Sequence, residues 1–335
     1  MTEFSQPSHK VDAMQTFYPS LPLKAEFIPS RLSLSTIVLA SAALIALAIT
    51  ATVALWHTFY ADKPAGLLAS YQLVGEPIII SGLEDNASGL TYSPVSNSLF
   101  MVVNNPEKVI ELSLDGDVLR TITLTGFEDT EGVAHVEGDR FIILEERRSA
   151  VNFVTINSNT RNINKSETSQ FALNIFTNSE KNLRLEGVSI DHATGDIYLV
   201  KEKSPRALYK ISGLLNNATD VNISIPWDIE AVNSSISDLS GVFFEPNSRR
   251  LLVLSHESFS LSEFGLAGQH FSRMKLKRSN HALLDSIPQA EGVTLAADGS
   301  LYIVSEPNLL YRFTNKASKT PGEVALHNTS QASQI

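Results

Sequence analysis

"TEGVAHVEGDRFIILEERRSAVNFVTI", residues 130–156, opens with a Glu-Gly pair and contains a strongly apolar run at 141–144. A Glu-Glu pair ends that run, and a third segment of alternating character follows a polar break. Short apolar runs and period-2 alternation between turn signals are typical of strands and not of helices. The stretch therefore predicts three antiparallel strands, with acids where the first begins and where the second ends.

The same pattern occurs five times along the chain, beginning at residues 87, 130, 185, 239 and 290. Its paired glycines stand at 89, 132, 187, 241 and 292, so the steps are 43, 55, 54 and 51 residues. Steps of this length are typical of propeller blades, which normally have four strands. The sequence therefore predicts an all-β fold, a five-bladed β-propeller over 71–315. The alternative, six blades, would need a further repeat that the sequence does not show.

Closure of the propeller is predicted from the two ends of the repeat region. The first four copies each leave room for a fourth strand, whereas the fifth stops near residue 313. The segment "YQLVGEPIII", residues 71–80, reads as a strand without a blade of its own. Because an open end would leave an unpaired strand edge, we expect 71–80 to complete the last blade.

A long uncharged segment precedes the repeats. Residues 32–61 contain no Asp, Glu, Lys or Arg, and 37–56 alone provides 20 apolar or small residues, enough for a helix to span a bilayer. Lys10, Lys24 and Arg31 come before it, which places the N-terminus in the cytoplasm. A cleaved signal peptide is the alternative, but its charged and apolar regions would be shorter. We expect a disordered cytoplasmic tail (1–30), a transmembrane anchor (31–61), a linker (62–70), a periplasmic propeller and a flexible tail (316–335), in the cell inner membrane.

Composition excludes several functions. The chain has 36 acidic and 26 basic residues, a net charge of −10, which argues against a nucleic-acid partner. It has no cysteine, so disulfides, thiolate metal sites and a cysteine nucleophile are excluded. The sequence also lacks the G-x-S-x-G, H-E-x-x-H, Walker A and G-x-G-x-x-G motifs.

The repeat places polar residues in two columns. In a propeller the first strand of each blade lies nearest the axis, and its start lies beside the end of the antiparallel second strand. Both columns should therefore surround one mouth of the central channel, where we expect six carboxylates. The first column is Ser88, Glu131, Glu186, Ser240 and Glu291, and the second is Asn105, Glu146, Glu202, His256 and Glu306.

Six carboxylates around one opening repel one another. Two charges 4 Å apart cost about 4 kcal/mol at an effective dielectric constant near 20. The acids must be protonated, separated by water, paired with cations such as the rim residues Arg147, Arg148 and Lys201, or bound to a metal. Hard oxygen ligands without cysteine favour calcium. The structural alternative is that each Glu accepts backbone N–H bonds and each Gly lets strands approach closely near the axis.

The motifs around these acids also resemble a known family. "EDNASGLTY" (84–92), "FEDTEGVAHVEGDRFIILEERR" (127–148), "LEGVSID" (185–191) and "AEGVTLAADGSLYIVSEPN" (290–308) resemble the SdiA-regulated family, over about 71–313. The resemblance implies a β-propeller held in the bacterial envelope by an N-terminal membrane segment, linked to calcium-dependent regulation and to control by a quorum-sensing regulator. It implies no catalytic activity. The positions that match the family signature are Asp129, Glu131, Glu145, Glu146 and Arg147.

Two function classes follow from these observations. The first is a membrane-anchored, extracytoplasmic binding module that holds calcium or a cationic ligand and engages an envelope protein. The second is a calcium-dependent hydrolase of phosphoesters or lactones that uses the same carboxylates, with His256 as the better histidine for a base or ligand. Because copies one and four carry Ser, Asn or His in place of the acids, any site must be lopsided. The metal or ligand candidates are Asp129, Glu131, Glu146, Glu186, Glu202, Glu291, Glu306 and His256.

Overall fold

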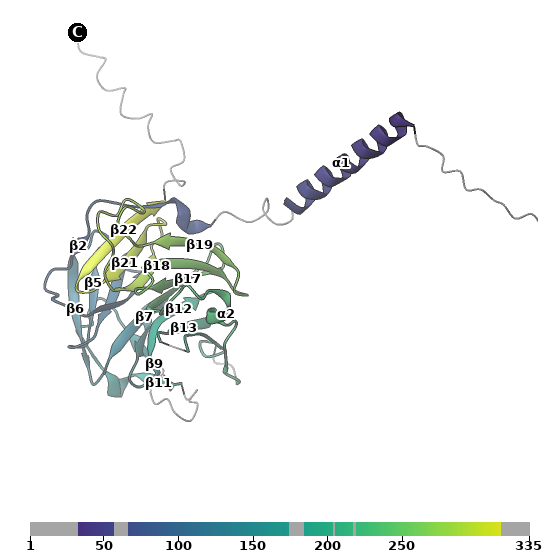
Figure 1. The fold of residues 1–335 in the computed structure, drawn as a ribbon. Helices are drawn as coiled ribbons and strands as arrows, with labels where there is room; N and C mark the ends of the chain where they lie inside the picture. Colours follow the sequence, from purple (N-terminus) through teal and green to yellow (C-terminus); the bar gives the residue numbers. More distant parts are fainter. Residues whose placement is uncertain (1–32, 57–65, 174–183, 204, 217–218, 316–335) are drawn as a thin grey trace, which may run out of the picture. The chain divides into compact units, whose positions relative to one another are not determined.

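The chain divides into two units, residues 1–62 and 63–335, the first with an apolar helix and the second with five β-sheets (Figure 1). The predicted tails 1–30 and 316–335 lie outside the described residues. The computed structural model describes residues 33–56, 66–173, 184–203, 205–216 and 219–315.

The helix of the first unit is α1, Leu34–Trp56. Ser33 Oγ accepts a hydrogen bond from the backbone N–H of Thr36 (3.2 Å), which caps its first turn. The hydroxyls of Thr50 and Thr52 donate to carbonyls one turn earlier, so these polar atoms are satisfied inside the helix, as a hydrocarbon environment requires. Over Leu34–Val53 the mean hydropathy is 2.3, and the helix is long and apolar enough to cross a membrane.

The second unit confirms the five-bladed propeller. Each of the five repeats forms one antiparallel sheet whose first three strands follow one another in sequence. The blades are β3 Ala87–Ser93, β4 Ser98–Val103, β5 Lys108–Leu112 and β6 Val118–Thr125; β7 Thr130–Glu137, β8 Arg140–Glu145, β9 Ala150–Thr155 and β11 Ser169–Ala172; β12 Leu185–Asp191, β13 Asp196–Lys201, β14 Ala207–Ser212 and β15 Asn222–Ser224; β16 Gly241–Glu245, β17 Arg250–Ser255, β18 Ser260–Gly265 and β19 His270–Lys275; and β20 Ala290–Leu295, β21 Leu301–Ser305 and β22 Leu309–Asn315.

The predicted closure is confirmed as well. Strands β1 (Tyr71–Leu73) and β2 (Ile78–Ile79) both pair antiparallel with β22, so the start of the propeller completes the blade that its end leaves short. Two strands share this position because the chain turns between them at Gly75, whose φ of +71° is in the left-handed region. The N-terminal latch therefore covers the edge that β22 would otherwise expose.

The latch begins earlier than the predicted linker 62–70 allows. Residues Leu67–Ser70 form a 3₁₀ turn, and Leu68 is fully buried in the core between the fourth and fifth blades. The backbone N–H of Leu67 donates to Glu263 Oε2 (2.8 Å) on β18. The linker prediction is wrong for residues 67–70. The buried Leu68 side chain and the hydrogen bond from Leu67 to Glu263 hold them against the propeller.

Five hydrophobic clusters hold the blades together, one at each interface between neighbours. Within β4, Leu99, Met101 and Val103 face the fifth blade, whereas Phe100 and Val102 face the second. Side chains of a strand point alternately to the two faces of its sheet, so a strand that is buried on both faces must be apolar throughout. This explains the uninterrupted apolar run in every copy of the repeat.

One connection departs from the regular order. Between β9 and β11 the chain leaves the second blade, and β10 (Asn162–Asn164) pairs parallel with β6 of the first blade. The Arg120 guanidinium on β6 donates to the carbonyls of Asn157 (2.6 Å) and Thr160 (3.1 Å) and so fastens the start of this excursion. A 3₁₀ turn at Lys165–Glu167 returns the chain to the second blade, and the other short helix, α2 (Ile229–Val232), joins the third and fourth blades.

Candidate functional site

The paired glycines form a tight ring around the axis. A Cβ on Gly89 would lie 2.6 Å from the Glu131 carbonyl of the next blade, and one on Gly292 would lie 2.6 Å from the Leu90 nitrogen of the first blade. The first strands therefore approach one another as closely as glycine allows. The cavity between them measures only about 10 Å³, room for about one water molecule. The first strands therefore leave no open channel at the level of the glycines.

We call the group around this mouth the acid cup and define it by its six glutamates. A backbone bond repeated in three blades places the two columns side by side. Glu146 N–H donates to the Asp129 carbonyl (2.9 Å), Glu202 N–H to that of Arg184 (3.0 Å), and Glu306 N–H to that of Gln289 (3.0 Å). Each of these acceptors stands three residues before a paired glycine. The acid cup consists of Glu131, Glu146, Glu186, Glu202, Glu291 and Glu306.

Glu131 is the most enclosed acid of the cup, with 8% of its surface exposed. Its Oε2 accepts a hydrogen bond from Ser88 Oγ (2.6 Å), and its Oε1 accepts one from the Asn104 amide. Burial raises the pKa of Glu131 to about 7; these two hydrogen bonds lower it, and the charges of Asp129 and Glu146 raise it further. Near neutral pH this carboxyl therefore ionises with difficulty unless a cation compensates its charge.

Glu186 lies where the acids of the cup converge. Burial raises its pKa well above the usual value, and the charges of Glu131, Glu146, Glu202 and Glu291 raise it further, in that order. These four residues come from three different blades. Glu186 therefore retains a proton most strongly, or shares in binding a cation.

The first potential ligand group contains Asp129, Glu131 and Glu146, each with one carboxylate oxygen within 4.8 Å of the others. Asp129 has a φ of +61°, a left-handed conformation that Asp tolerates better than most residues. The Arg147 guanidinium lies 3.4 Å from Asp129, but the Arg147 side chain is 68% exposed, so this pair is weak. The two side-chain hydrogen bonds that Glu131 accepts come from neutral groups, Ser88 and Asn104.

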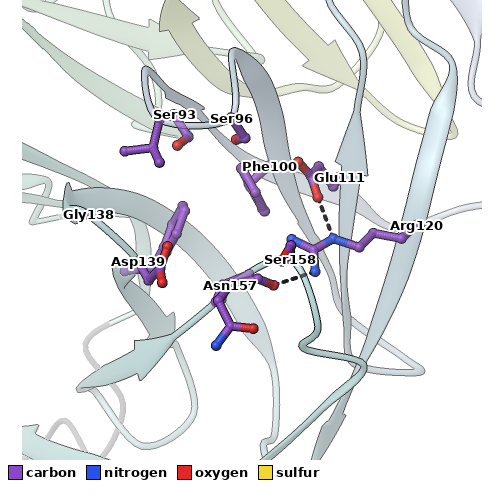
Figure 2. Close-up of a pocket in the computed structure, with 12 residues that line it drawn as sticks. Ser93, Ser96, Phe100, Glu111, Arg120, Gly138, Asp139, Asn157 and Ser158 are labelled. Carbon is purple, nitrogen blue, oxygen red and sulfur yellow. Dashed lines mark hydrogen bonds and ion pairs between the residues drawn. The ribbon is translucent and has the colours of Figure 1, made fainter.

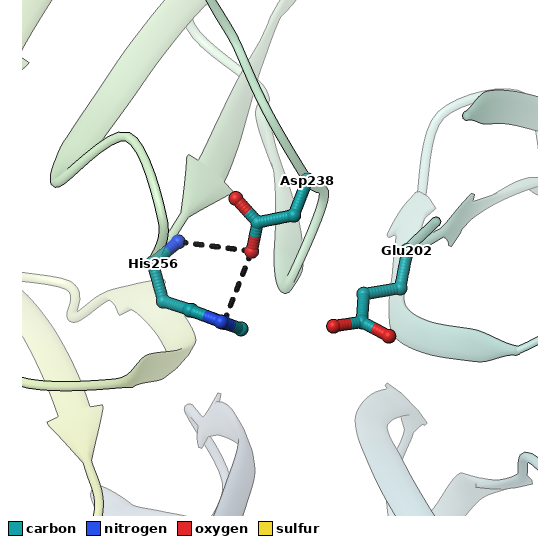
Figure 3. A group of neighbouring side chains, drawn as sticks. All are labelled: Glu202, Asp238 and His256. Carbon is teal, nitrogen blue, oxygen red and sulfur yellow. Dashed lines mark hydrogen bonds and ion pairs between the residues drawn. The ribbon is translucent and has the colours of Figure 1, made fainter. Parts of the chain in front are cut away.

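The second potential ligand group contains Glu202, Asp238 and His256 (Figure 3). Asp238 is completely buried and accepts from the Ser255 hydroxyl and from the backbone N–H groups of His256 (3.2 Å) and Glu257 (3.1 Å). His256 Nδ1 lies 3.0 Å from Asp238 Oδ2 and 3.4 Å from Glu291 Oε1.

Charge in this second group is balanced internally. Contact with Asp238, and then with Glu291, raises the pKa of His256 to about 10. Burial alone would raise the pKa of Asp238, but the contacts with His256 and Ser255 outweigh it and hold the pKa below its usual value. At neutral pH the group is therefore an imidazolium with carboxylates around it. A protonated ring offers no lone pair to a metal.

The remaining predicted residues lie around these two groups. Burial raises the pKa of Glu291, and burial with the charge of Glu291 raises that of Glu306, which also accepts from Gln289 Nε2 (2.7 Å). Arg148 lies 3.1 Å from Glu128, and both side chains are half exposed. Glu145, which matches the family signature, points away from the cup: it is fully buried and ion-paired with Lys165 (2.5 Å).

Lys201 does not lie at the rim as predicted. It is 3% exposed, and its ammonium donates to the carbonyls of Lys203 (3.0 Å) and Pro205 (3.1 Å). The end of β13 turns this side chain inward beneath the following loop, where backbone oxygens replace water. The lysine at the mouth is Lys203, which bridges Glu202 (2.6 Å) and Glu257 (2.7 Å).

Sequence reasoning missed Asp238 and Asn104. Asp238 stands three residues before Gly241, the same offset that Asp129 has from Gly132, so a third column would have revealed it. Asn104 precedes Asn105 of the second column by one residue, and the bulge between β3 and β4 gives no signal in the repeat pattern. The predicted Ser88 and Ser240 bind the neighbouring blade, since Ser88 donates to Glu131 and Ser240 to the Ala290 carbonyl (2.6 Å).

Several solved structures are similar to this chain. A chain of a nidogen/laminin complex has 13% identity and a TM-score of 0.45, over 66% of this chain and 73% of that one. Luciferin-regenerating enzyme has 11% identity and a TM-score of 0.48, over 71% and 95%. The calcium-binding protein regucalcin from Agrobacterium tumefaciens has 12% identity and a TM-score of 0.47, over 74% and 94%.

The repeat, the latch and the glutamate-glycine signature all fall within one family match. It extends over residues 64–314, which includes the whole described propeller except its last residue, 315. The chain belongs to the SdiA-regulated family.

Proposed function

We propose that this protein is a membrane-anchored binding module whose acid cup holds calcium through Asp129, Glu131 and Glu146. The observation that supports the proposal is the convergence of these three carboxylates within 4.8 Å, one of them buried. Ionised carboxylates at such distances repel by about 4 kcal/mol per pair at an effective dielectric constant near 20. A divalent cation would remove that repulsion.

The donor set fits calcium. It consists only of oxygens, and calcium takes 6 to 8 oxygen ligands in flexible geometry. Three carboxylates provide part of that number, and the carboxyl of Glu186 interacts electrostatically with Glu131 and Glu146. The remaining positions would fall to water or to oxygen atoms of a ligand. Bound calcium would supply a concentrated positive charge at the floor of the mouth, suited to an oxygen-rich partner.

The second group is a poorer place for a metal, because His256 already compensates Asp238 and Glu291. The cup is therefore divided into a half with its own cation, His256, and a half in which Glu131 accepts hydrogen bonds from the neutral groups Ser88 and Asn104. This division favours a single calcium near the second blade, and it agrees with the lopsided distribution of acids in the repeat.

Hydrolysis with the same carboxylates is the alternative that the sequence leaves open. Its candidate base, His256, has a pKa of about 10 and is protonated at neutral pH, so it cannot accept a proton there. The guanidinium of Arg148 and the ammonium of Lys203 are already paired with acids. Both features favour binding over catalysis.

Placement in the cell rests on helix α1 and the charges around it. The apolar helix would anchor the protein in the inner membrane, and Lys10, Lys24 and Arg31 would keep the N-terminus in the cytoplasm. The propeller would then lie in the periplasm, where the calcium-loaded cup could meet an envelope protein and take part in calcium-linked signalling.

Calcium titration of the full chain in lipid nanodiscs tests the proposal. Ligand binding to the folded state should stabilise it by about 2.7 kcal/mol at 100 times the Kd, seen as a rise in Tm. Glu131→Gln should abolish the rise. Glu137→Gln is the matched control, since Glu137 lies at the far end of the same strand with a 71% exposed side chain. An unchanged Tm in the intact protein would refute the site, and calcium-dependent turnover of a phosphoester or lactone, lost in Glu131→Gln, would favour the hydrolase.

A further inference from the structure

A second cavity lies at the other end of the blades, between the first and the second (Figure 2). Strand β3 starts at the acid cup and ends at Ser93, which lines this cavity, so the two sites lie at opposite ends of the strand. The cavity measures about 450 Å³, within the range of small-molecule sites, roughly 300–1,000 Å³. No residue of the acid cup lines it.

One wall of the cavity is a chain of hydrogen bonds. Ser98 Oγ donates to Glu111 Oε1 (2.6 Å), and Glu111 Oε2 is ion-paired with Arg120 Nε. Since Ser98 gives its only proton to Glu111, the 2.7 Å contact between the Ser96 and Ser98 hydroxyls must have Ser96 as the donor. The oxygen of Ser96 is therefore left as an acceptor.

The ionic groups of this wall compensate each other. Glu111 and Arg120 form a buried pair, and Arg120 uses further N–H groups on the carbonyls of Asn157 and Thr160. Because Glu111 and Arg120 are paired with each other, neither is available to pair with a charged ligand. An anionic ligand is disfavoured by the exposed carboxylate of Asp139, whereas a neutral ligand with many hydroxyl groups matches that carboxylate together with the serine hydroxyls and the amide.

The floor of the cavity is apolar. Phe100 and Phe141 meet there with ring centroids 4.7 Å apart, and Ile156 lies beside them. At the edge, Val95 is 62% exposed and adds apolar surface. An apolar floor with a few polar groups above it is the general construction of a small-molecule site. Phe100 and Phe141 are each only 1% exposed, so the apolar surface that a sugar ring can reach is chiefly that of Val95 at the edge, while its hydroxyls bond to the polar groups.

At the corresponding place between the third and fourth blades, an ion pair joins the two blades. Asp191 of the third blade stands four residues after its paired glycine, and Arg249 of the fourth blade stands just before the second strand. Their side chains form an ion pair (2.8 Å), and the Arg249 guanidinium lies over the Phe244 ring. The residues at these two positions in the first and second blades are Ser93 and Asp139. They cannot form an ion pair, so the cavity stays open.

From this comparison we propose that the cavity between the first two blades binds a neutral saccharide of one or two rings. The residues that the sugar contacts are Ser93, Val95, Ser96, Asp139 and Asn157.

Saturation-transfer NMR on the full chain in phosphatidylcholine nanodiscs, which carry no sugar, tests the proposal with glucose, galactose and N-acetylglucosamine as probes and alanine as a zwitterionic control. At least one sugar should show transfer from the protein, and alanine should show none. The double variant Ser93→Asp with Asp139→Arg recreates the Asp191–Arg249 pair and should abolish the signal, whereas Glu131→Gln should leave it intact. No signal from any sugar, or an unchanged signal in the double variant, would overturn the proposal.

A second measurement does not depend on the stability of that double variant. The chain has no cysteine, so Ser158→Cys places a single thiol at the exposed rim of the cavity. The sugar that gives transfer should slow alkylation of this thiol, roughly tenfold at ten times its Kd by mass action. Alkylation at the same rate with and without sugar would place the binding elsewhere and refute the site.

Discussion

His256 Nδ1 lies 3.0 Å from Asp238 Oδ2, and the same nitrogen lies 3.4 Å from Glu291 Oε1. One imidazolium thus neutralises a completely buried carboxylate of its own blade and a second one on the next blade. This arrangement gives the half of the acid cup around Asp238 a cation of its own, whereas Glu131 in the other half accepts hydrogen bonds from the neutral groups Ser88 and Asn104.

Removing this internal cation should destabilise the protein. His256→Gln leaves Asp238 buried without its counter-charge, and breaking a buried ion pair typically costs about 3–5 kcal/mol. The loss is measured as the free energy of unfolding in urea. Adding Asp238→Asn to His256→Gln should recover most of it, because no buried charge then remains. A single variant as stable as the double variant would contradict the role of His256 as counter-ion.

The pH dependence of stability should have an unusual direction. Glu131 has a pKa of about 7 in the folded protein against 4.5 in general, so between these values the folded state binds more protons than the unfolded state. Stability without metal must then fall as pH rises from 4.5 to 7, by up to about 3 kcal/mol for this one group. Glu186, Glu291 and Glu306 act in the same direction because their pKa values are also raised.

Thermal unfolding in the presence of a chelator measures this effect. We expect a higher Tm at pH 5 than at pH 7.5, a smaller difference in Glu131→Gln, and a smaller difference again when calcium replaces the chelator. The carboxyl of Asp238, whose pKa is lowered, contributes oppositely, but only as pH falls below its usual value of 3.8. Because the lowered pKa values of His135 and His270 act in the opposite direction, the comparison with Glu131→Gln decides. A Tm–pH profile without metal that is identical in the two proteins would show that Glu131 is not held protonated.

The N-terminal latch should contribute to the stability of the whole propeller. Leu68 is fully buried between the fourth and fifth blades, and a buried Leu→Ala change typically costs about 2–5 kcal/mol. Leu119→Ala is the matched control, because Leu119 on β6 is 55% exposed and should lose little. Equal effects of the two substitutions on the urea midpoint would mean that the latch is not part of the cooperative unit.

The architecture was predictable because its signals are periodic. Five copies of one pattern determine five sheets, and the missing strand in the last copy points to residues 71–80. The boundary of the latch was missed because it depends on a single contact, Leu68 in a core built mainly by residues more than 180 positions later. Likewise β10 carries no repeat signal, since its pairing with β6 depends on a loop that returns to the preceding blade.

The site was predictable in outline only. The columns indicate which residues share the mouth, but they do not show how charge is distributed there. The partner of each carboxyl, whether Ser88, His256 or another acid, depends on the direction in which the side chain points at a β-bulge. Such bulges follow the first residue of β7, β12 and β20. The inward turn of Lys201 is of the same kind, because neighbouring residues of a strand end point to opposite sides.

The closed ring of glycines gives the most direct test of the hub. A Cβ at Gly292 would lie 2.6 Å from the Leu90 nitrogen and 2.8 Å from Val304 Cγ2, so Gly292→Ala must push the fifth blade away from the first. Overpacking a rigid contact typically costs about 1–3 kcal/mol, and backbone on the opposing side puts this case at the upper end.

The fifth and first blades are joined by the latch as well, so the ring should open without complete unfolding. Urea denaturation should show the loss, and hydrogen exchange should show faster exchange in β3 and β20 than in β12. Unchanged stability with unchanged exchange at β3 and β20 would show that the hub has more space than its glycines indicate.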